Sequence, residues 1–138
     1  MSWLYKGQII EEIPESETKP YGFIYVITQV STNKKYIGRK YFTKAGYKTV
    51  KKKKKRIRVE SDWKKYWSSS PSLLQAIKDA GEADFTREIV KLCYSKSECS
   101  YYETKLIFET DAIISENYFN DWVSCKISRK HIKNINFS

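Results

Sequence analysis

The clearest pattern in the chain is a pair of strand-like segments separated by turn residues. Residues 23–30 form an apolar run rich in β-branched and aromatic side chains, and residues 35–39 return to a strand-like pattern. Between them, Ser31-Thr32-Asn33-Lys34 consists of residue types that favour turns. The pattern predicts a β-hairpin over this region.

Each strand of the predicted hairpin carries a tyrosine, Tyr25 on the first and Tyr36 on the second. With a four-residue turn and a regular register, Tyr36 faces Gln29, which has the same side-chain parity as Tyr25. Both phenol groups are therefore expected on one face of the sheet, provided that no bulge intervenes. Gly38 lies inside the second strand, where glycine lowers stability unless a backbone or ligand must come close.

Two helices and a third strand are predicted after the hairpin. Ser70-Pro71 is typical of a helix start, with serine as N-cap and proline at the first helical position, and Gly81 marks the end of this short helix. Residues 85–92 predict the third strand, and residues 95–98 fit a capping box that opens a longer helix. The apolar stripe expected on that helix consists of Cys99, Tyr102, Leu106 and Ile113.

Two segments depart from this regular pattern. Residues 1–20 are predicted to be an N-terminal arm, because acidic residues and two prolines interrupt its short apolar stretches. Residues from about 43 to 60 are predicted to be a basic insertion, which is either a solvated loop or a long hairpin lying along phosphates. At 138 residues, the length predicts a single domain over residues 21–138 that includes this insertion.

The charge balance favours a negatively charged partner. The chain has 26 Lys and Arg residues against 16 Asp and Glu residues, which gives a net charge of +10. Such a surface attracts DNA or RNA, although an acidic membrane surface or an effect on solubility is also compatible. The basic residues expected to contact nucleic acid are Lys40, Lys51, Lys52, Lys53, Lys54, Lys55, Arg56, Arg58, Lys64 and Lys65.

Several other classes of protein are disfavoured. The single histidine, His131, argues against nucleases built on histidine clusters and against Ser-His-Asp hydrolases. The sequence lacks a phosphate-binding glycine loop and any apolar run near the roughly 20 residues that a membrane helix needs. Cys93, Cys99 and Cys125 have no paired metal spacing, so reduced thiols are expected. These features predict a cytoplasmic protein, in the host cytoplasm if the source is viral, with no membrane partner.

Glu103 is the most informative acidic residue, because it falls in the apolar band of the longer helix together with Ile107 and Ile114. A carboxylate in this band needs a cation or hydrogen bonds, supplied by a basic side chain or by a hard metal such as Mg²⁺. From periodicity alone, a salt-bridged helix glutamate is the favoured interpretation.

The segments Phe23-Ile24-Tyr25 and Tyr36-Ile37-Gly38 resemble the paired motifs of the GIY-YIG nucleases. This family includes phage homing endonucleases, some restriction enzymes and the incision subunit of nucleotide excision repair. The first motif departs from the usual one, because the extra Phe23 displaces Gly22 by one residue. The resemblance covers about residues 22–120, with gaps. It implies an α+β fold in which a small three-stranded antiparallel sheet is flanked by helices.

The resemblance also implies a divalent-metal-dependent endonuclease that hydrolyses DNA phosphodiester bonds. By this resemblance Glu103 holds one Mg²⁺ or Mn²⁺, Tyr25 acts as or positions the general base, and Tyr36 orients the water. Arg39 is the favoured phosphate contact, and Arg56 or Arg58 in the insertion are the alternatives for the family's arginine.

Two further family positions have candidates in this chain. Asn120, after Phe119, matches an asparagine that follows the helix, and Asn117 competes for that assignment. Residues 67–70 resemble a segment of small hydroxyl residues that a histidine or tyrosine precedes in the family, for which this chain offers Tyr66 or Trp67.

Three alternatives stay open at this point. Glu103-Thr104-Lys105 also matches the E-x-K half of another nuclease superfamily, with Asp84 as a second acid, but that architecture requires a strand there. The second alternative is a non-catalytic basic module that binds nucleic acid on the same scaffold. The third is an oligomerisation or partner-binding domain that uses the arm and the basic loop. A homodimer would make double-strand breaks, whereas a monomer with one site would nick.

Overall fold

The fold of the computed structural model, which describes residues 2–132, is α+β and is built on a mixed five-stranded sheet in the order β2-β1-β7-β3-β4. Strand β1 runs parallel to β7, and the other neighbouring strands are antiparallel. The strands of this sheet are β1 (Trp3–Tyr5), β2 (Gln8–Ile10), β3 (Gly22–Gln29), β4 (Lys35–Tyr41) and β7 (Phe85–Cys93).

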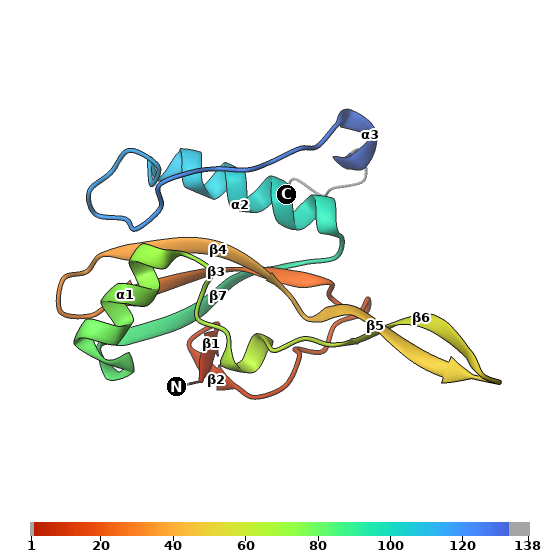
Figure 1. The fold of residues 1–138 in the computed structure, drawn as a ribbon. Coiled ribbons are helices and arrows are strands. Elements are labelled where there is room, and N and C mark those ends of the chain that lie inside the picture. Colours follow the sequence, from red (N-terminus) through yellow and green to blue (C-terminus); the bar gives the residue numbers. More distant parts are fainter. Residues whose placement is uncertain (1, 133–138) are drawn as a thin grey trace.

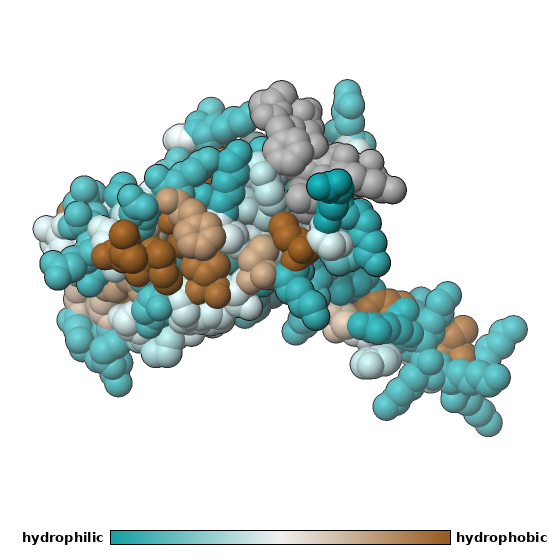
Figure 2. Space-filling model, turned by 90° about the horizontal axis from the view of Figure 1, so that it is seen from above, coloured by the Kyte–Doolittle hydropathy of each residue, from teal (hydrophilic) through white to brown (hydrophobic). Residues whose placement is uncertain are grey.

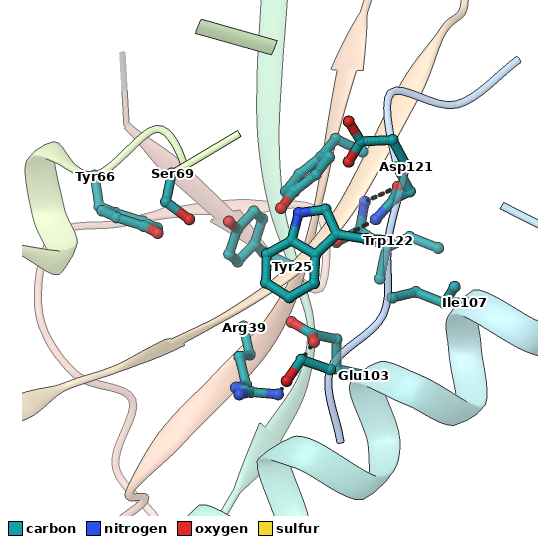
Figure 3. A pocket seen from close by; sticks show the side chains of 12 residues that line it. Tyr25, Arg39, Tyr66, Ser69, Glu103, Ile107, Asp121 and Trp122 are labelled. Atoms are coloured by element: carbon teal, nitrogen blue, oxygen red, sulfur yellow. Dashed lines mark hydrogen bonds and ion pairs between the residues drawn. The ribbon is translucent and has the colours of Figure 1, made fainter. Parts of the chain in front are cut away.

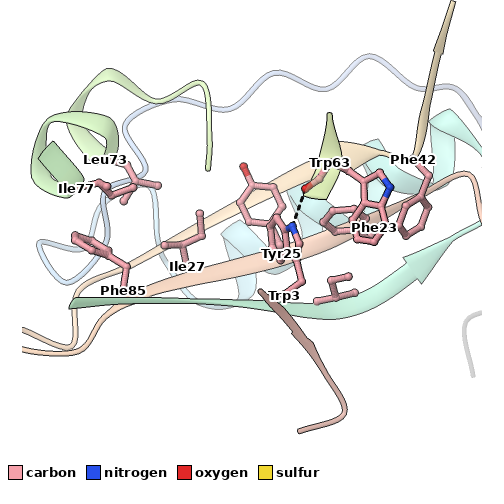
Figure 4. Close-up of a cluster of buried hydrophobic side chains, with 10 residues drawn as sticks. Trp3, Phe23, Tyr25, Ile27, Phe42, Trp63, Leu73, Ile77 and Phe85 are labelled. Atoms are coloured by element: carbon pink, nitrogen blue, oxygen red, sulfur yellow. Dashed lines mark hydrogen bonds between the residues drawn. The ribbon is translucent and has the colours of Figure 1, made fainter. Parts of the chain in front are cut away.

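Each face of the sheet has its own core, because alternate residues of β3 point to opposite sides. Phe23, Tyr25 and Ile27 pack with side chains of α1 (Pro71–Ala80) and of the short 3₁₀ helix η1 (Trp63–Lys65) (Figure 4). On the other face, Ile24 packs with side chains of α2 (Lys96–Glu109), which crosses that side of the sheet (Figure 1). Side chains on the two faces therefore have different neighbours.

The hairpin predicted over residues 23–39 is β3 and β4, but its register differs from the expected one by two residues. Tyr36 pairs with Ile27 rather than Gln29, and Tyr25 pairs with Gly38. The turn begins one residue earlier in the sequence than expected, because Val30 belongs to it. Asn33, within the turn, has a left-handed backbone with φ of 59°. A shift of two preserves side-chain parity, so both phenol groups lie on one face, as predicted.

The prediction of a three-stranded antiparallel sheet was wrong in its strand count and in strand direction. Residues 3–10, which were expected to belong to an arm, form the hairpin β1–β2, whose turn residues Lys6 and Gly7 have positive φ. Trp3 holds this hairpin on the sheet: it is 1% exposed, packs on Phe23, and donates a hydrogen bond from Nε1 to the Trp63 carbonyl oxygen at 2.7 Å. Tertiary packing stabilises strands that are too short to show a pattern.

The basic insertion is a long hairpin rather than an irregular loop. Strands β5 (Thr43–Val50) and β6 (Lys53–Glu60) pair along their full length as a separate two-stranded sheet. This hairpin extends away from the five-stranded sheet (Figure 1). Its two turn residues, Lys51 and Lys52, have φ of 50° and 64°, as a tight hairpin turn requires.

The starts of both helices agree with the capping signals in the sequence. The Ser70 side chain accepts a hydrogen bond from the Leu73 N–H, and the Ser95 side chain accepts one from the Glu98 N–H. The end of the longer helix differs from the expectation, because α2 stops at Glu109. Two residues assigned to its apolar band, Ile113 and Ile114, therefore lie outside the helix, and Ile114 is 79% exposed.

Beyond α2 the chain returns to the outer edge of β4. The Lys35 N–H donates to the Asn117 carbonyl at 3.0 Å, and the Phe119 N–H donates to the Lys35 carbonyl at 2.7 Å. Farther along the strand, the Asn120 side chain makes the hydrogen bonds to β4 in place of the backbone. Its Oδ1 accepts from the Ile37 N–H at 3.0 Å, and its Nδ2 donates to the Ile37 carbonyl at 2.8 Å. Residues 117–120 thus cover the first half of this sheet edge.

The remaining short elements are η2 (Glu82–Asp84) and α3 (Arg129–Ile132). Cys93, Cys99 and Cys125 are free thiols, and the first two are buried, in agreement with the sequence analysis. Within residues 2–132, every helix is too short or too polar to cross a membrane.

Replacement of Asn120 by alanine is expected to destabilise the fold. The change leaves the Ile37 N–H and carbonyl without their buried partner, at a cost of about 1–3 kcal/mol for each unsatisfied group. Urea unfolding should report the loss, and hydrogen exchange at the Ile37 amide should accelerate. Asn117→Ala is the control, because its exposed side chain should contribute little. Equal stability of the two variants would contradict this role.

Candidate active site

A cleft of about 170 Å³ opens at the edge of the sheet beside β4 (Figure 3). Side chains from β3, β4, α2 and the segments around residues 66–69 and 120–124 line it. The chemically reactive members of the lining are Tyr25, Tyr36, Arg39, Tyr66, Glu103 and Asp121.

The cleft combines side chains from both faces of the sheet. Tyr25 and Tyr36 belong to the face that α1 covers, whereas Ile37 belongs to the core under α2. Arg39 shares the side-chain parity of Ile37 and reaches Glu103 on α2. Only at the rim of a sheet can residues from opposite faces approach one another, and β4 is the outermost strand of this sheet.

Gly38 makes this arrangement sterically feasible. It pairs with Tyr25 across the strands, and the Tyr25 ring lies over it. A Cβ at position 38 would overlap the phenol oxygen and Cζ of Tyr25 and would lie 2.9 Å from its Cε2. The glycine of the second motif is therefore required by the close approach of a side-chain ring, whereas the sequence analysis expected a backbone or a ligand there.

Three tyrosines form a cluster on the α1 side of the cleft. The ring centroid of Tyr25 lies 6.2 Å from that of Tyr36 and 6.2 Å from that of Tyr66. Burial raises the pKa of Tyr25 well above its ordinary value of 10.0, the neighbouring phenols add to the rise, and hydrogen bonding with Ser68 opposes it. Burial also raises the pKa of Tyr36. Both phenols are neutral at neutral pH in the free protein.

Glu103 and Arg39 form an ion pair on the α2 side, with 3.2 Å between Arg39 Nη1 and Glu103 Oε1. The Glu103 side chain is 15% exposed and the Arg39 side chain 29%. Burial raises the pKa of Glu103 above 4.5 although Arg39 opposes this effect, so desolvation outweighs the ion pair. For Arg39, burial lowers the pKa, but Glu103 and Tyr41 raise it by more.

Glu103 and Asp121 are the two acidic residues in the cleft lining. Residues 2–132 contain no group of three or more His, Cys, Asp or Glu side chains positioned to hold a metal. Mg²⁺ in phosphoryl-transfer sites is commonly bound by one or two carboxylates together with waters and substrate phosphates. The donor set therefore fits a metal for which the protein supplies one or two carboxylate ligands, and water and substrate phosphates supply the others.

The structure brings together five of the predicted site residues, Tyr25, Tyr36, Arg39, Glu103 and Asn120, around one cleft. The side-chain amide of Asn120 is engaged with the Ile37 backbone, so it fixes the edge of β4 in place. Asn117, the competing candidate, does not line the cleft.

The alternative arginines lie outside the cleft, on β6. Arg58 donates to the Thr43 carbonyl at 2.8 Å at the base of the basic hairpin, and Arg56 is exposed farther along the strand. Among the three candidate arginines, Arg39 is the one beside Glu103.

The remaining predicted nucleic-acid contacts are also spread along the hairpin and its base. Lys51, Lys52, Lys53, Lys54 and Lys55 are exposed at and near the hairpin tip. Lys40 Nζ lies 2.6 Å from Asp62 Oδ1 and 3.9 Å from the Tyr66 ring centroid, beside the cleft. Lys64 pairs with Glu12 at 3.1 Å, and Lys65 is exposed.

The E-x-K alternative is wrong. Glu103 lies on α2, whereas that architecture requires a strand. Asp84, its second acid, is engaged elsewhere: its carboxylate accepts hydrogen bonds from Gln29 and Ser31 at the turn of the β3–β4 hairpin.

Several cleft residues were not predicted or were left ambiguous. Of the two candidates before the serines, Tyr66 lines the cleft, whereas Trp67 packs on Phe85. Asp121 and Trp122 follow Asn120 directly, and their adjacency to that residue was the available signal.

Arg87 supports the loop that carries Tyr66. It is 2% exposed, its guanidinium carbon lies 4.6 Å from the Trp3 ring centroid and 4.4 Å from that of Trp67, and its Nη1 donates to the Tyr66 carbonyl at 2.8 Å. Burial lowers the pKa of Arg87 to about 10, so the guanidinium stays charged at neutral pH. A buried cation on β7 therefore anchors one wall of the cleft.

Comparison with known proteins gives one match. A family model described as "Putative endonuclease segE, GIY-YIG domain" matches residues 3–123, which is most of the chain. No curated protein and no solved structure matches the chain.

Replacement of Gly38 by alanine is expected to destabilise the protein by about 1–3 kcal/mol, because the new methyl group overlaps the buried Tyr25 ring. Thermal and urea unfolding measure the change. The matched control is Gly46→Ala in the exposed basic hairpin, where the new Cβ meets only the Val59 side chain. That change should stay within about 0.5 kcal/mol. A Gly38→Ala protein as stable as the wild type would contradict the close packing.

Replacement of Glu103 by glutamine is expected to raise thermal stability at neutral pH. Burial raises the pKa of Glu103 above 4.5 in the folded state. At a pH above this raised pKa, ionisation of Glu103 lowers the stability of the fold, and this cost disappears as the pH falls toward 4.5. The melting temperature of the variant minus that of the wild type should therefore be positive near pH 7 and shrink on acidification. Glu109→Gln, at an exposed position of the same helix, is the control. A difference that grows on acidification would contradict this assignment.

Proposed function

The chain belongs to the family of GIY-YIG nuclease domains of phage-type endonucleases, and from this membership we propose that it hydrolyses DNA phosphodiester bonds in the cleft beside β4, using a divalent metal. One observation carries the proposal. Residues as far apart in sequence as Tyr25 and Glu103, on opposite faces of the sheet, line the same cleft. A purely structural salt bridge has no need of tyrosines from the other face.

Glu103 is the residue that would hold the metal, Mg²⁺ or Mn²⁺, with Asp121 as a second acid in the same cleft. A metal bound there would neutralise charge that develops on the scissile phosphate and on the leaving 3′ oxygen. Arg39 clamps the non-bridging phosphate oxygens, because a guanidinium offers two parallel donors to an oxyanion. Its position beside Glu103 supports the proposal that both residues act on one phosphate.

The tyrosines position the attacking water. Their raised pKa values keep both phenols protonated in the free protein, where each can donate a hydrogen bond and also accept one. Tyr36, at the more open side, orients the water, and Tyr25 acts as the general base or positions it. For Tyr25 to accept a proton itself, positive charge must be brought close enough to offset the effect of burial.

The basic residues hold the DNA around this chemistry. We assign phosphate contacts to Lys40, beside the cleft, to the basic hairpin, and to Lys64 and Lys65 in η1. The chain acts as one nuclease domain with residues 43–60 as an insertion, and residues 1–20 contribute strands β1 and β2 to its sheet. One copy, with one cleft of this kind among its described residues, would nick DNA, whereas two copies acting together would cut both strands.

A non-catalytic DNA-binding module is the second candidate. The Arg39–Glu103 ion pair favours it, because a guanidinium occupies the carboxylate that a nuclease needs for metal. The two functions differ in whether strand breaks depend on added metal.

We expect the purified protein to convert supercoiled plasmid to the nicked form with Mg²⁺ or Mn²⁺, and excess EDTA to stop the reaction. Glu103→Gln should lose cleavage by at least about 100-fold, because the metal ligand is removed, while DNA affinity changes by less than threefold. Gel conversion and fluorescence anisotropy measure the two properties. Glu109→Gln on the same helix is the control. Normal cleavage by the Glu103→Gln protein would overturn the assignment, and DNA binding without any metal-dependent cleavage by the wild type would favour the non-catalytic module.

A further inference from the structure

We propose that the basic hairpin enters the major groove of duplex DNA edge-on, with strand β6 leading and with both faces of the hairpin turned toward phosphates. The choice of DNA as partner rests on the proposed nuclease function. The geometry of entry rests on the hairpin itself.

Most of the net charge of the protein lies in this hairpin. Residues 43–60 contain nine basic residues and one acidic residue, which accounts for eight of the ten net positive charges of the chain. The rest of the molecule, with the cleft, is close to neutral. Attraction of a polyanion is therefore concentrated in one element.

The hairpin is also structurally separate from the five-stranded sheet. Within the described residues, β5 and β6 pair only with each other. The hairpin projects from the body, and from above it is a mostly hydrophilic extension (Figures 1 and 2). Tyr47 on β5 is 71% exposed. An extended two-stranded element without a hydrophobic core of its own is suited to contact with a partner.

The register divides the side chains between two faces. Tyr47 pairs with Arg56 and Lys48 pairs with Lys55, and residues that pair directly lie on the same face. One face therefore carries Lys54 and Arg56 with Tyr47, and the opposite face carries Lys53 and Lys55 with Lys48.

Consecutive basic residues thus make β6 cationic on both faces. Residues 53–56 are all basic and all exposed. A hairpin that lies flat on DNA uses one face only, so every second residue of such a run would point away from the phosphates. An edge-on approach instead uses them all, because the two walls of a DNA groove are both phosphate backbones. Strand β5 has only two basic residues, Lys44 and Lys48, so β6 is the leading strand.

The dimensions agree with the major groove. A two-stranded element with side chains on both faces is about 10 Å thick, and the major groove is about 12 Å wide, whereas the minor groove is only about 6 Å wide. Strands of eight residues span about 27 Å, which is close to one turn of duplex DNA at about 34 Å.

A series of basic residues links this hairpin to the cleft. Arg39 lines both the cleft and an adjacent hollow, and Lys40 and Lys44 line the same hollow. Lys44 is near the start of β5, at the base of the hairpin. The backbone of DNA bound at β6 would therefore run toward Arg39, where the reacting phosphate would lie.

Two matched double variants test the edge-on geometry. Lys53→Gln with Lys55→Gln removes two charges from one face, and Lys54→Gln with Arg56→Gln removes two charges from the other. Binding to a 30-base-pair duplex is measured by fluorescence anisotropy in EDTA, over a range of salt concentrations, so that cleavage plays no part. The control is Lys78→Gln with Lys96→Gln, which removes two exposed charges on α1 and α2.

Both hairpin variants should lose affinity equally, by roughly tenfold or more at 0.1 M salt, and each should reduce the magnitude of the salt slope by about 1.8. The control should change affinity by less than threefold. A large loss in only one hairpin variant means flat binding and overturns the proposal, as does a loss in neither. If both losses are equal but plasmid is never cleaved, the proposed function fails and the binding geometry stands.

A competition experiment identifies the groove. Methyl green, which occupies the major groove, should displace the protein from the duplex, whereas netropsin, which occupies the minor groove, should leave it bound. The opposite order overturns the proposal. Single-stranded DNA of the same length should bind more weakly, and equal or tighter binding to it also overturns the proposal.

Discussion

The absence of a side chain at Gly38 is the constraint on which the candidate site depends. The Tyr25 ring occupies the space above this glycine, where no Cβ fits. Since Gly38 lies on the outermost strand, the ring reaches the rim of the sheet while its base stays in the core. Arg39, the next residue, points to the opposite face and meets Glu103 there. The two halves of the cleft are thus joined through two consecutive residues of one strand.

The same burial that shapes the cleft restrains its chemistry. Tyr25 and Glu103 are both enclosed enough that desolvation, rather than a charged neighbour, is the largest effect on their pKa values. In each case it favours the neutral form. Positive charge brought close to either group would oppose this effect. Among the described residues that line the cleft, Arg39 is the one permanent cation, and Lys40 and Lys44 line the adjacent hollow.

The sequence predicted those features that depend on local pattern, and it failed where partners are remote. The shared face of Tyr25 and Tyr36 was predictable because parity survives a register error of two residues. The helix starts were predictable from their serine caps. Strands β1 and β2 were missed, since three residues show no periodicity and Trp3 owes its place to Trp63, sixty residues away. The charge partner of Glu103 was likewise invisible, because Arg39 lies on another element.

The parallel pairing of β1 with β7 has a consequence for the order in which the chain folds. Trp3 pairs locally with Ile10 on β2, but it also pairs with Arg87, so the β1–β2 hairpin joins the sheet only after β7 has been synthesised. Closing so long a loop slows folding, because the entropy of closure is lost before the contacts form. Trp3 also packs against Tyr25. The floor beneath the phenol cluster is therefore completed only after β7 has joined the sheet.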